Sequence, residues 1–193
     1  VKHSQAMVNR RILDAIGKHP AVTLMDIGIG QGIQVLQLLQ DAEQIPTLQS
    51  LHVIGIEPFA DALEDSRQRI EAYAANSRIK VTFEGRCAFA EDVDFHTLNI
   101  GTAPLMVNAS LALHHIRTQE QRFNTLLGIR HLNPAALLLI EPNSDHFQDD
   151  YFRRYQCCFN HYYNLFCVID QLDIAEEDKN TLKLFFGREI NDV

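Results

Sequence analysis

Three glycines at alternate positions follow an aspartate at the end of a short apolar run. The segment MDIGIGQG spans residues 25–32 and contains Asp26, Gly28, Gly30 and Gly32. Glycine tolerates a left-handed turn, and it lets a ligand lie against backbone N–H groups where a helix begins. The spacing therefore predicts a nucleotide-type binding loop between a strand and a helix.

Asp26 narrows the choice of ligand. A dinucleotide fingerprint has the pattern G-x-G-x-x-G, but Ile33 stands where its last glycine would be. A carboxylate that faces the ligand repels a diphosphate and attracts a positive group. S-adenosylmethionine, with its ammonium and sulfonium charges, fits better than a nicotinamide dinucleotide, which we keep as a weaker alternative.

Further polar residues follow the other apolar runs. Glu57 ends the run LHVIGIE, where its carboxylate can accept hydrogen bonds from both ribose hydroxyls of an adenosine. The segment after the third run, GRCAFAED, would lie beside the adenine. The predicted cofactor-binding residues are Asp26, Gly28, Gly30, Gly32, Glu57, Pro58, Cys87, Ala88, Phe89, Asn108 and Ala109.

Methyl transfer from such a cofactor needs an oriented acceptor and, for a hydroxyl or protonated amine, a general base such as histidine. The predicted catalytic residues are His114, Glu141 and His146, with Ser110, His115, Asn143 and Tyr162 predicted at the acceptor. Structural roles are the open alternative for each of them. We predict no metal site, because neighbouring histidines point in two directions on a helix and lack further ligands.

The elements that must position these residues alternate along the chain. Short runs rich in β-branched residues or leucine predict buried parallel strands at 22–27, 51–56, 79–83, 104–109 and 136–141. Helical patterns fall at 4–18, 32–44, 59–76, 118–132 and 149–172. A helix followed by five rounds of strand and helix predicts a doubly wound α/β fold, Rossmann-like, with ligands at the carboxyl ends of the strands.

The bulk composition excludes several classes of protein. The 193 residues, 46% of them hydrophobic, suit a single globular domain over 1–193. A net charge of -8 disfavours nucleic-acid binding, and no apolar run suits a membrane helix or a signal peptide. The four cysteines indicate reduced thiols, and we expect a cytoplasmic protein whose partner is a small-molecule substrate, a second copy or another protein.

Motifs in order along most of the chain resemble the GRAS-domain family, a methyltransferase-like family. They are NRRILDAI near the start, DIGIGQGIQ, VN followed by four residues and LHH, the E-x-x-x-x-H segment with the helix after it, and FFGREIND near the end. Asn108 and His114 match the V-N and L-H positions, and Glu141 and His146 match the ends of E-x-x-x-x-H. Most known members are plant transcriptional regulators that work through protein contacts.

Two departures from the family pattern bear on function. Regulatory plant members typically have D-F-D and G-P-P, where this chain has DIG and EPF and so retains the cofactor glycine and the ribose acid. The chain therefore resembles a bacterial-type member that kept its cofactor site. Our primary hypothesis is an S-adenosylmethionine-dependent methyltransferase acting on a small molecule, and the alternative is a cofactor-binding, non-catalytic regulator.

The resemblance also implies segments at both ends of the chain. Class I methyltransferases end in an antiparallel hairpin, and residues 181–193 stop where that hairpin would be expected to start, so we expect its strands to have been removed or to lie outside this sequence. The helical cap that plant members carry ahead of the first motif is largely absent from the sequence.

Overall fold

The computed structural model describes residues 2–142, 149–187 and 190. The chain forms two compact units, Val1–Glu141 and Pro142–Val193, and each is described by itself. The prediction of one domain over the whole chain stays a prediction. In the described residues, none of the helices combines the length and apolar character needed to cross a membrane.

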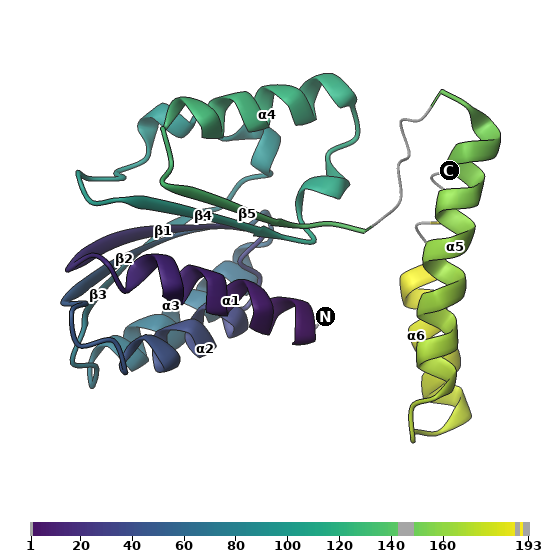
Figure 1. Cartoon of the computed structure of the whole chain (residues 1–193), viewed down its shortest axis with the longest axis horizontal. Helices are drawn as coiled ribbons and strands as arrows, with labels where there is room; N and C mark the ends of the chain where they lie inside the picture. The colour runs from purple at the N-terminus through teal and green to yellow at the C-terminus, as the bar shows by residue number, and fades with distance from the viewer. Residues whose placement is uncertain (1, 143–148, 188–189, 191–193) are drawn as a thin grey trace. The chain divides into compact units, whose positions relative to one another are not determined.

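The first unit is built on a five-stranded, all-parallel sheet with the order β3-β2-β1-β4-β5 (Figure 1). The strands are β1 (Ala21–Ile27), β2 (Ser50–Ile56), β3 (Lys80–Arg86), β4 (Leu105–Ser110) and β5 (Ala136–Ile140). The chain order reverses between β1 and β4, and this reversal defines the switch point of a doubly wound fold. The predicted α/β, Rossmann-like fold class is confirmed.

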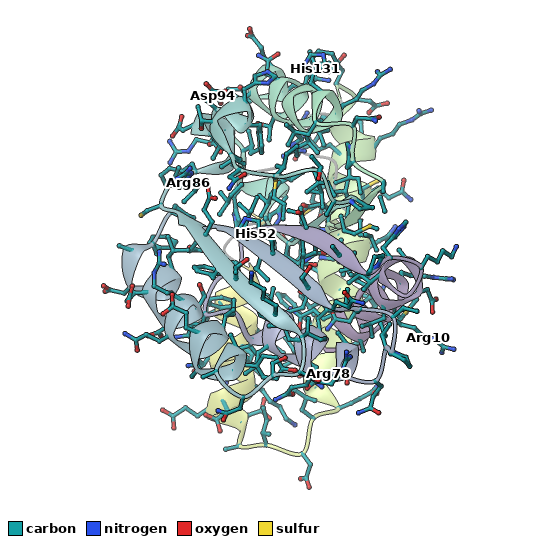
Figure 2. All side chains as sticks on the ribbon, turned by 90° about the vertical axis from the view of Figure 1, so that its left-hand side faces the viewer. Arg10, His52, Arg78, Arg86, Asp94 and His131 are labelled. Atoms are coloured by element: carbon teal, nitrogen blue, oxygen red, sulfur yellow. The ribbon has the colours of Figure 1, made fainter. Side chains whose placement is uncertain are left out.

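Helices cover both faces of this sheet, as Figures 1 and 2 show. One face carries α1 (Lys2–Ile16), α2 (Ile33–Ala42) and α3 (Ala60–Ala74), and the other carries α4 (Gln119–His131). The central strand β1 is buried on both sides because Leu24 points into the first layer and Met25 into the second. Buried parallel strands of this kind read as continuous apolar runs, which is why sequence alone locates them.

Local sequence determines where α4 begins and ends. Thr118 caps its start by accepting a hydrogen bond from the N–H of Gln121, and its own hydroxyl bonds the Gln121 side chain. Beyond its end, Asn133 adopts a left-handed φ of 52°, directly before Pro134. Asparagine tolerates that conformation and proline cannot continue the helix, so α4 stops there.

The structure differs from the expected elements at two places. The third round of strand and helix contains no α-helix: the short 3₁₀ turns η1 (Ala90–Asp92) and η2 (Phe95–Thr97) connect β3 to β4. Residues 176–187 form α6 (Glu176–Gly187), a helix that the sequence analysis did not predict.

The second unit consists of α5 (Tyr151–Asp170) packed against α6. Asp150 caps α5 by accepting hydrogen bonds from the N–H groups of Phe152 and Arg153. Cys158, Tyr162 and Ile169 are buried along one side of α5.

Candidate functional site

The carboxyl ends of the strands bring the predicted cofactor residues together. Asp26 pairs in register with Gly55 of β2 on one side and with Asn108 of β4 on the other. The loops that leave β1, β2 and β4 therefore start at the same edge of the sheet, where the fold class places its ligands.

The three glycines have different surroundings. A Cβ on Gly28 would lie 2.7 Å from the Cβ of Ala112, and a Cβ on Gly32 would lie 2.9 Å from the Cβ of Ser66. A Cβ on Gly30 would meet nothing within 4 Å. All three residues have positive φ. Gly28 and Gly32 are thus explained by close packing inside the protein, whereas Gly30 leaves open space next to the loop.

Asp26 is buried at the end of a short hydrogen-bonded chain. The Ser110 hydroxyl donates to Asn108 Oδ1 at 3.1 Å, and Asn108 Nδ2 donates to Asp26 Oδ2 at 3.0 Å. Burial raises the pKa of Asp26 to about 7, the hydrogen bond from Asn108 opposes that rise, and the charge of Glu57 adds to it. Asp26 therefore changes charge near neutral pH.

Glu57 ties the loop after β1 to the loop after β2. Its carboxylate accepts a hydrogen bond from the N–H of Gly30 at 3.0 Å and another from the N–H of Phe59 at 3.2 Å. The side chain is buried, with the whole residue 6% exposed. A carboxylate has about four acceptor positions, so two remain for hydroxyl donors of a ligand.

His114 and Glu141 form a pair at the ends of β4 and β5. His114 Nδ1 lies 2.7 Å from Glu141 Oε2, and the same carboxylate accepts hydrogen bonds from the N–H groups of Leu113 and His114. Glu141 thereby fixes the turn η3 (Leu113–His115), and Arg122 donates hydrogen bonds to the carbonyls of His114 in this turn and of Ile116 directly after it. The structure brings the two side chains together in an arrangement that also holds a turn, and their catalytic role stays a prediction.

The other predicted residues lie in different parts of the chain. Cys87 lies at the same edge, with its thiol 3.5 Å from the Pro58 carbonyl oxygen, and Phe89 nearby is 54% exposed. His115 is exposed beside the His114 ring. Tyr162 belongs to the second unit, and Asn143 and His146 lie outside the described residues.

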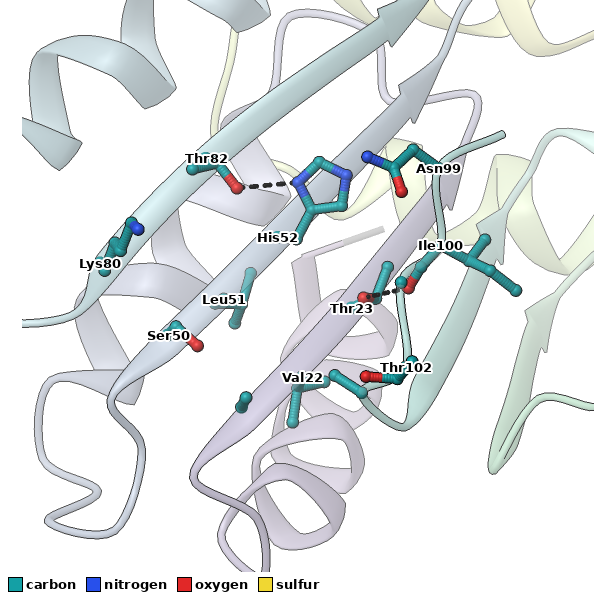
Figure 3. A pocket seen from close by; sticks show the side chains of 13 residues that line it. Val22, Thr23, Ser50, Leu51, His52, Lys80, Thr82, Asn99, Ile100 and Thr102 are labelled. Atoms are coloured by element: carbon teal, nitrogen blue, oxygen red, sulfur yellow. Dashed lines mark hydrogen bonds between the residues drawn. The ribbon is translucent and has the colours of Figure 1, made fainter. Parts of the chain in front are cut away.

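A hollow of about 540 Å³ opens at the opposite end of the sheet (Figure 3). It lies at the amino ends of β1, β2 and β3, where Ser50, His52 and Lys80 contribute to its lining. None of the predicted cofactor or catalytic residues lines it. Among the residues that line it, His52 Nδ1 lies 2.8 Å from the Thr82 hydroxyl, and the Thr23 hydroxyl donates a hydrogen bond to the Ile100 carbonyl at 2.8 Å.

Sequence reasoning missed three features of the carboxyl edge. Ser66 contacts the position of Gly32 from α3, and Arg122 holds the η3 carbonyls. Leu111, directly after β4, has a φ of 58°, which is rare for a leucine. The V-N-x-x-x-x-L-H spacing gives no signal for that conformation, because residues that favour it are glycine and asparagine.

Solved structures share this fold. SCL7 of Oryza sativa superimposes with a TM-score of 0.86 at 22% identity, covering 98% of this chain and 56% of that chain. The small RNA methyltransferase HEN1 gives a TM-score of 0.55 at 18% identity over 77% of this chain and 18% of that chain. At these identities the likeness establishes the fold alone.

Named relatives overturn the primary functional hypothesis. DELLA protein 2 of Medicago truncatula is 23% identical over 203 residues, 100% of this chain and 38% of that protein. The Scarecrow-like transcription factor PAT1 of Arabidopsis thaliana is 26% identical over 184 residues, 88% of this chain and 37% of that protein. Neither is named as a small-molecule methyltransferase, so that prediction is wrong and the regulator alternative is favoured. The methyl transfer to a small molecule in which we predicted roles for His114, Glu141 and His146 is therefore withdrawn.

The chain spans about four tenths of the length of these curated relatives, with 38% of DELLA protein 2 matched. The match to the family itself extends over all of the sequence given, residues 1–193. The resemblance in the motifs, the fold of SCL7 and this full-length match agree, and the chain belongs to the GRAS domain family.

Proposed function

We propose that this chain is a non-catalytic regulator that acts through protein contacts and binds a ligand of the S-adenosylmethionine type as an effector. The regulatory part is supported by relatives that include DELLA protein 2 and a transcription factor. A bacterial-type origin, a cytoplasmic location and the identity of the protein partner stay predictions.

The ligand part is carried by one observation, the open space at Gly30 beside two buried carboxylates. A Cβ on Gly30 would project into that space, and Asp26 and Glu57 are 4% and 6% exposed. Negative groups at this position suit an ammonium or sulfonium, and the remaining acceptor positions of Glu57 suit ribose hydroxyls. The residues present therefore fit S-adenosylmethionine or its thioether product.

Within the site, each residue has a binding or orienting task. Gly30 lets the ligand approach the backbone, Glu57 holds the nucleoside sugar, and Asp26 faces the positive group. S-adenosylmethionine supplies an activated methyl group when bound, but the proposed role as an effector needs no methyl transfer.

Two glycines allow a matched test of the ligand site. Gly30 and Gly101 both have positive φ, 54° and 65°, and a Cβ on either would meet nothing within 4 Å. Gly30→Ala and Gly101→Ala should therefore cost similar backbone strain, about 1–2 kcal/mol each. Only Gly30→Ala should weaken binding of S-adenosylhomocysteine in calorimetric titration, by tenfold or more, because Gly101 lines the hollow at the other end of the sheet.

The ligand site and the non-catalytic role are tested by separate experiments. No binding of S-adenosylhomocysteine by folded wild-type protein, or equal weakening by both alanine variants, would refute the ligand site. The non-catalytic part is tested by incubating the protein with S-adenosylmethionine and a panel of small-molecule hydroxyl and amine acceptors. Release of more than one equivalent of S-adenosylhomocysteine per protein would contradict it.

A further inference from the structure

Two neighbouring carboxylates at the candidate site are buried without a cation. Asp26 and Glu57 lie on adjacent strands β1 and β2, or directly after them, and each is less than a tenth exposed. Within the described part of the chain, no Lys, Arg or His comes within ion-pair distance of either one. Buried charges are normally paired, so this pair requires either a proton or a cationic partner.

The two carboxylates are not equivalent. Glu57 accepts hydrogen bonds from two backbone N–H groups, those of Gly30 and Phe59. Asp26 accepts one side-chain hydrogen bond, from the neutral amide of Asn108, whose orientation is set by the hydroxyl of Ser110. Asp26 is therefore the member that holds the proton.

Among the residues that the structure describes, the side chains that act on the pKa of Asp26 are those of Asn108 and Glu57. Glu57 is the charged residue that acts on it, and the β4 neighbours Asn108 and Ser110 are neutral. On the same face, α1 and α2 bury apolar side chains, and the buried amide of Asn9 is paired with Gln34.

We propose that ligand binding at this site is linked to proton release: a cationic ligand group at the end of β1 displaces the proton that Asp26 holds when the ligand is absent. The inference rests on the proposed ligand site and adds a regulatory property to it. One proton leaves Asp26 for the solvent, and the positive charge of the ligand replaces it beside the two carboxylates.

The direction of the pH effect follows from this exchange. The ligand binds the ionised form of Asp26, so its affinity should rise by up to tenfold per pH unit while Asp26 is mainly protonated. Because burial raises the pKa of Asp26 to about 7, the rise should level off above that pH. A cell compartment that became more acidic would thus release the ligand.

Calorimetric titration in two buffers tests the proposal. S-adenosylhomocysteine, which carries an ammonium group, is titrated into the wild-type chain between pH 5.5 and 8 in phosphate and in imidazole. These buffers differ in ionisation enthalpy, so a difference in apparent heat counts the protons released. We expect a release approaching one proton per site at pH 6 and close to none at pH 8.

Two controls identify the source of the proton. Asp26→Asn keeps the shape of the side chain but has no proton to release, so its binding heat should not depend on the buffer. 5′-Methylthioadenosine has the nucleoside and thioether without the ammonium, and it should bind wild type without proton release. If Asp26→Asn does not fold, the buffer dependence of the binding heats of the two ligands with the wild-type protein tests proton release.

The outcomes distinguish this inference from the proposed function. Binding of S-adenosylhomocysteine with buffer-independent heat, or buffer-dependent heat that persists in Asp26→Asn, would overturn proton linkage and leave the ligand site standing. Absence of binding by either ligand to folded protein would overturn both.

Discussion

Asp26 lies at the candidate site, and its burial makes the stability of the folded protein depend on pH. In the unfolded chain its carboxyl ionises at an ordinary aspartate pKa of about 3.9, whereas burial in the fold raises the pKa to about 7. The folded state therefore holds a proton that the unfolded state releases, and the stability that comes from neutral Asp26 is lost as pH rises between these two values.

Replacement by asparagine measures this effect. Asp26→Asn retains an acceptor for Asn108 and carries no charge, so its stability advantage over wild type should grow by up to about 1.4 kcal/mol per pH unit between about pH 4 and 7 and then stay constant. Urea unfolding of both proteins at pH 5, 6, 7 and 8 gives this difference. A difference that does not change with pH would show that Asp26 stays ionised in the folded protein.

Packing of α2 against α3 depends on one contact at the start of α2. Gly32, the N-cap of α2, has a φ of 73°, and an added Cβ would lie 2.9 Å from Ser66 Cβ and 3.1 Å from Ser66 Cα. Because the nearest atoms include backbone, Gly32→Ala must displace one helix. Together with the left-handed backbone this should cost about 3 kcal/mol, more than Gly30→Ala.

A double variant separates the two causes of that loss. Ser66→Gly removes the Cβ that the methyl group introduced by Gly32→Ala would strike, and it leaves the backbone strain unchanged. Thermal unfolding of the two single variants and the double variant should therefore show a favourable coupling of about 1 kcal/mol or more. Simple additivity would mean that strain alone makes Gly32 necessary.

The glycine loop at residues 25–32 and the elements around it show what the sequence could and could not predict. The strands, the five helices α1 to α5 and the strand ends near Asp26, Glu57 and Asn108 follow from apolar periodicity and turn residues, which are local signals. The spacing of glycines could not separate Gly30 from Gly32, because the difference lies in Ser66, which is 34 positions further along the chain. The helix at 176–187 was missed because the family hairpin, rather than its own period, guided the expectation there.

The two apolar clusters found in the described residues both lie in the first compact unit. One lies between the sheet and α1–α3, the other between the sheet and α4, and all buried members of both precede residue 141. Both faces of β1 and β4 are covered by helices and turns of the same unit. A polypeptide with its own core on both sides of its sheet meets the main requirement for folding alone.

We therefore expect a fragment of residues 1–141 to fold. It should show a cooperative thermal transition by circular dichroism, and it should retain binding of S-adenosylhomocysteine within about tenfold of the full chain, because Asp26, Gly30, Glu57 and Asn108 all lie within it. The fragment carrying Gly30→Ala is the binding control. A fragment that folds but binds more than a hundredfold weaker would mean that residues 142–193 contribute directly to the ligand site, whereas one that fails to unfold cooperatively would mean that the two apolar clusters are insufficient without them.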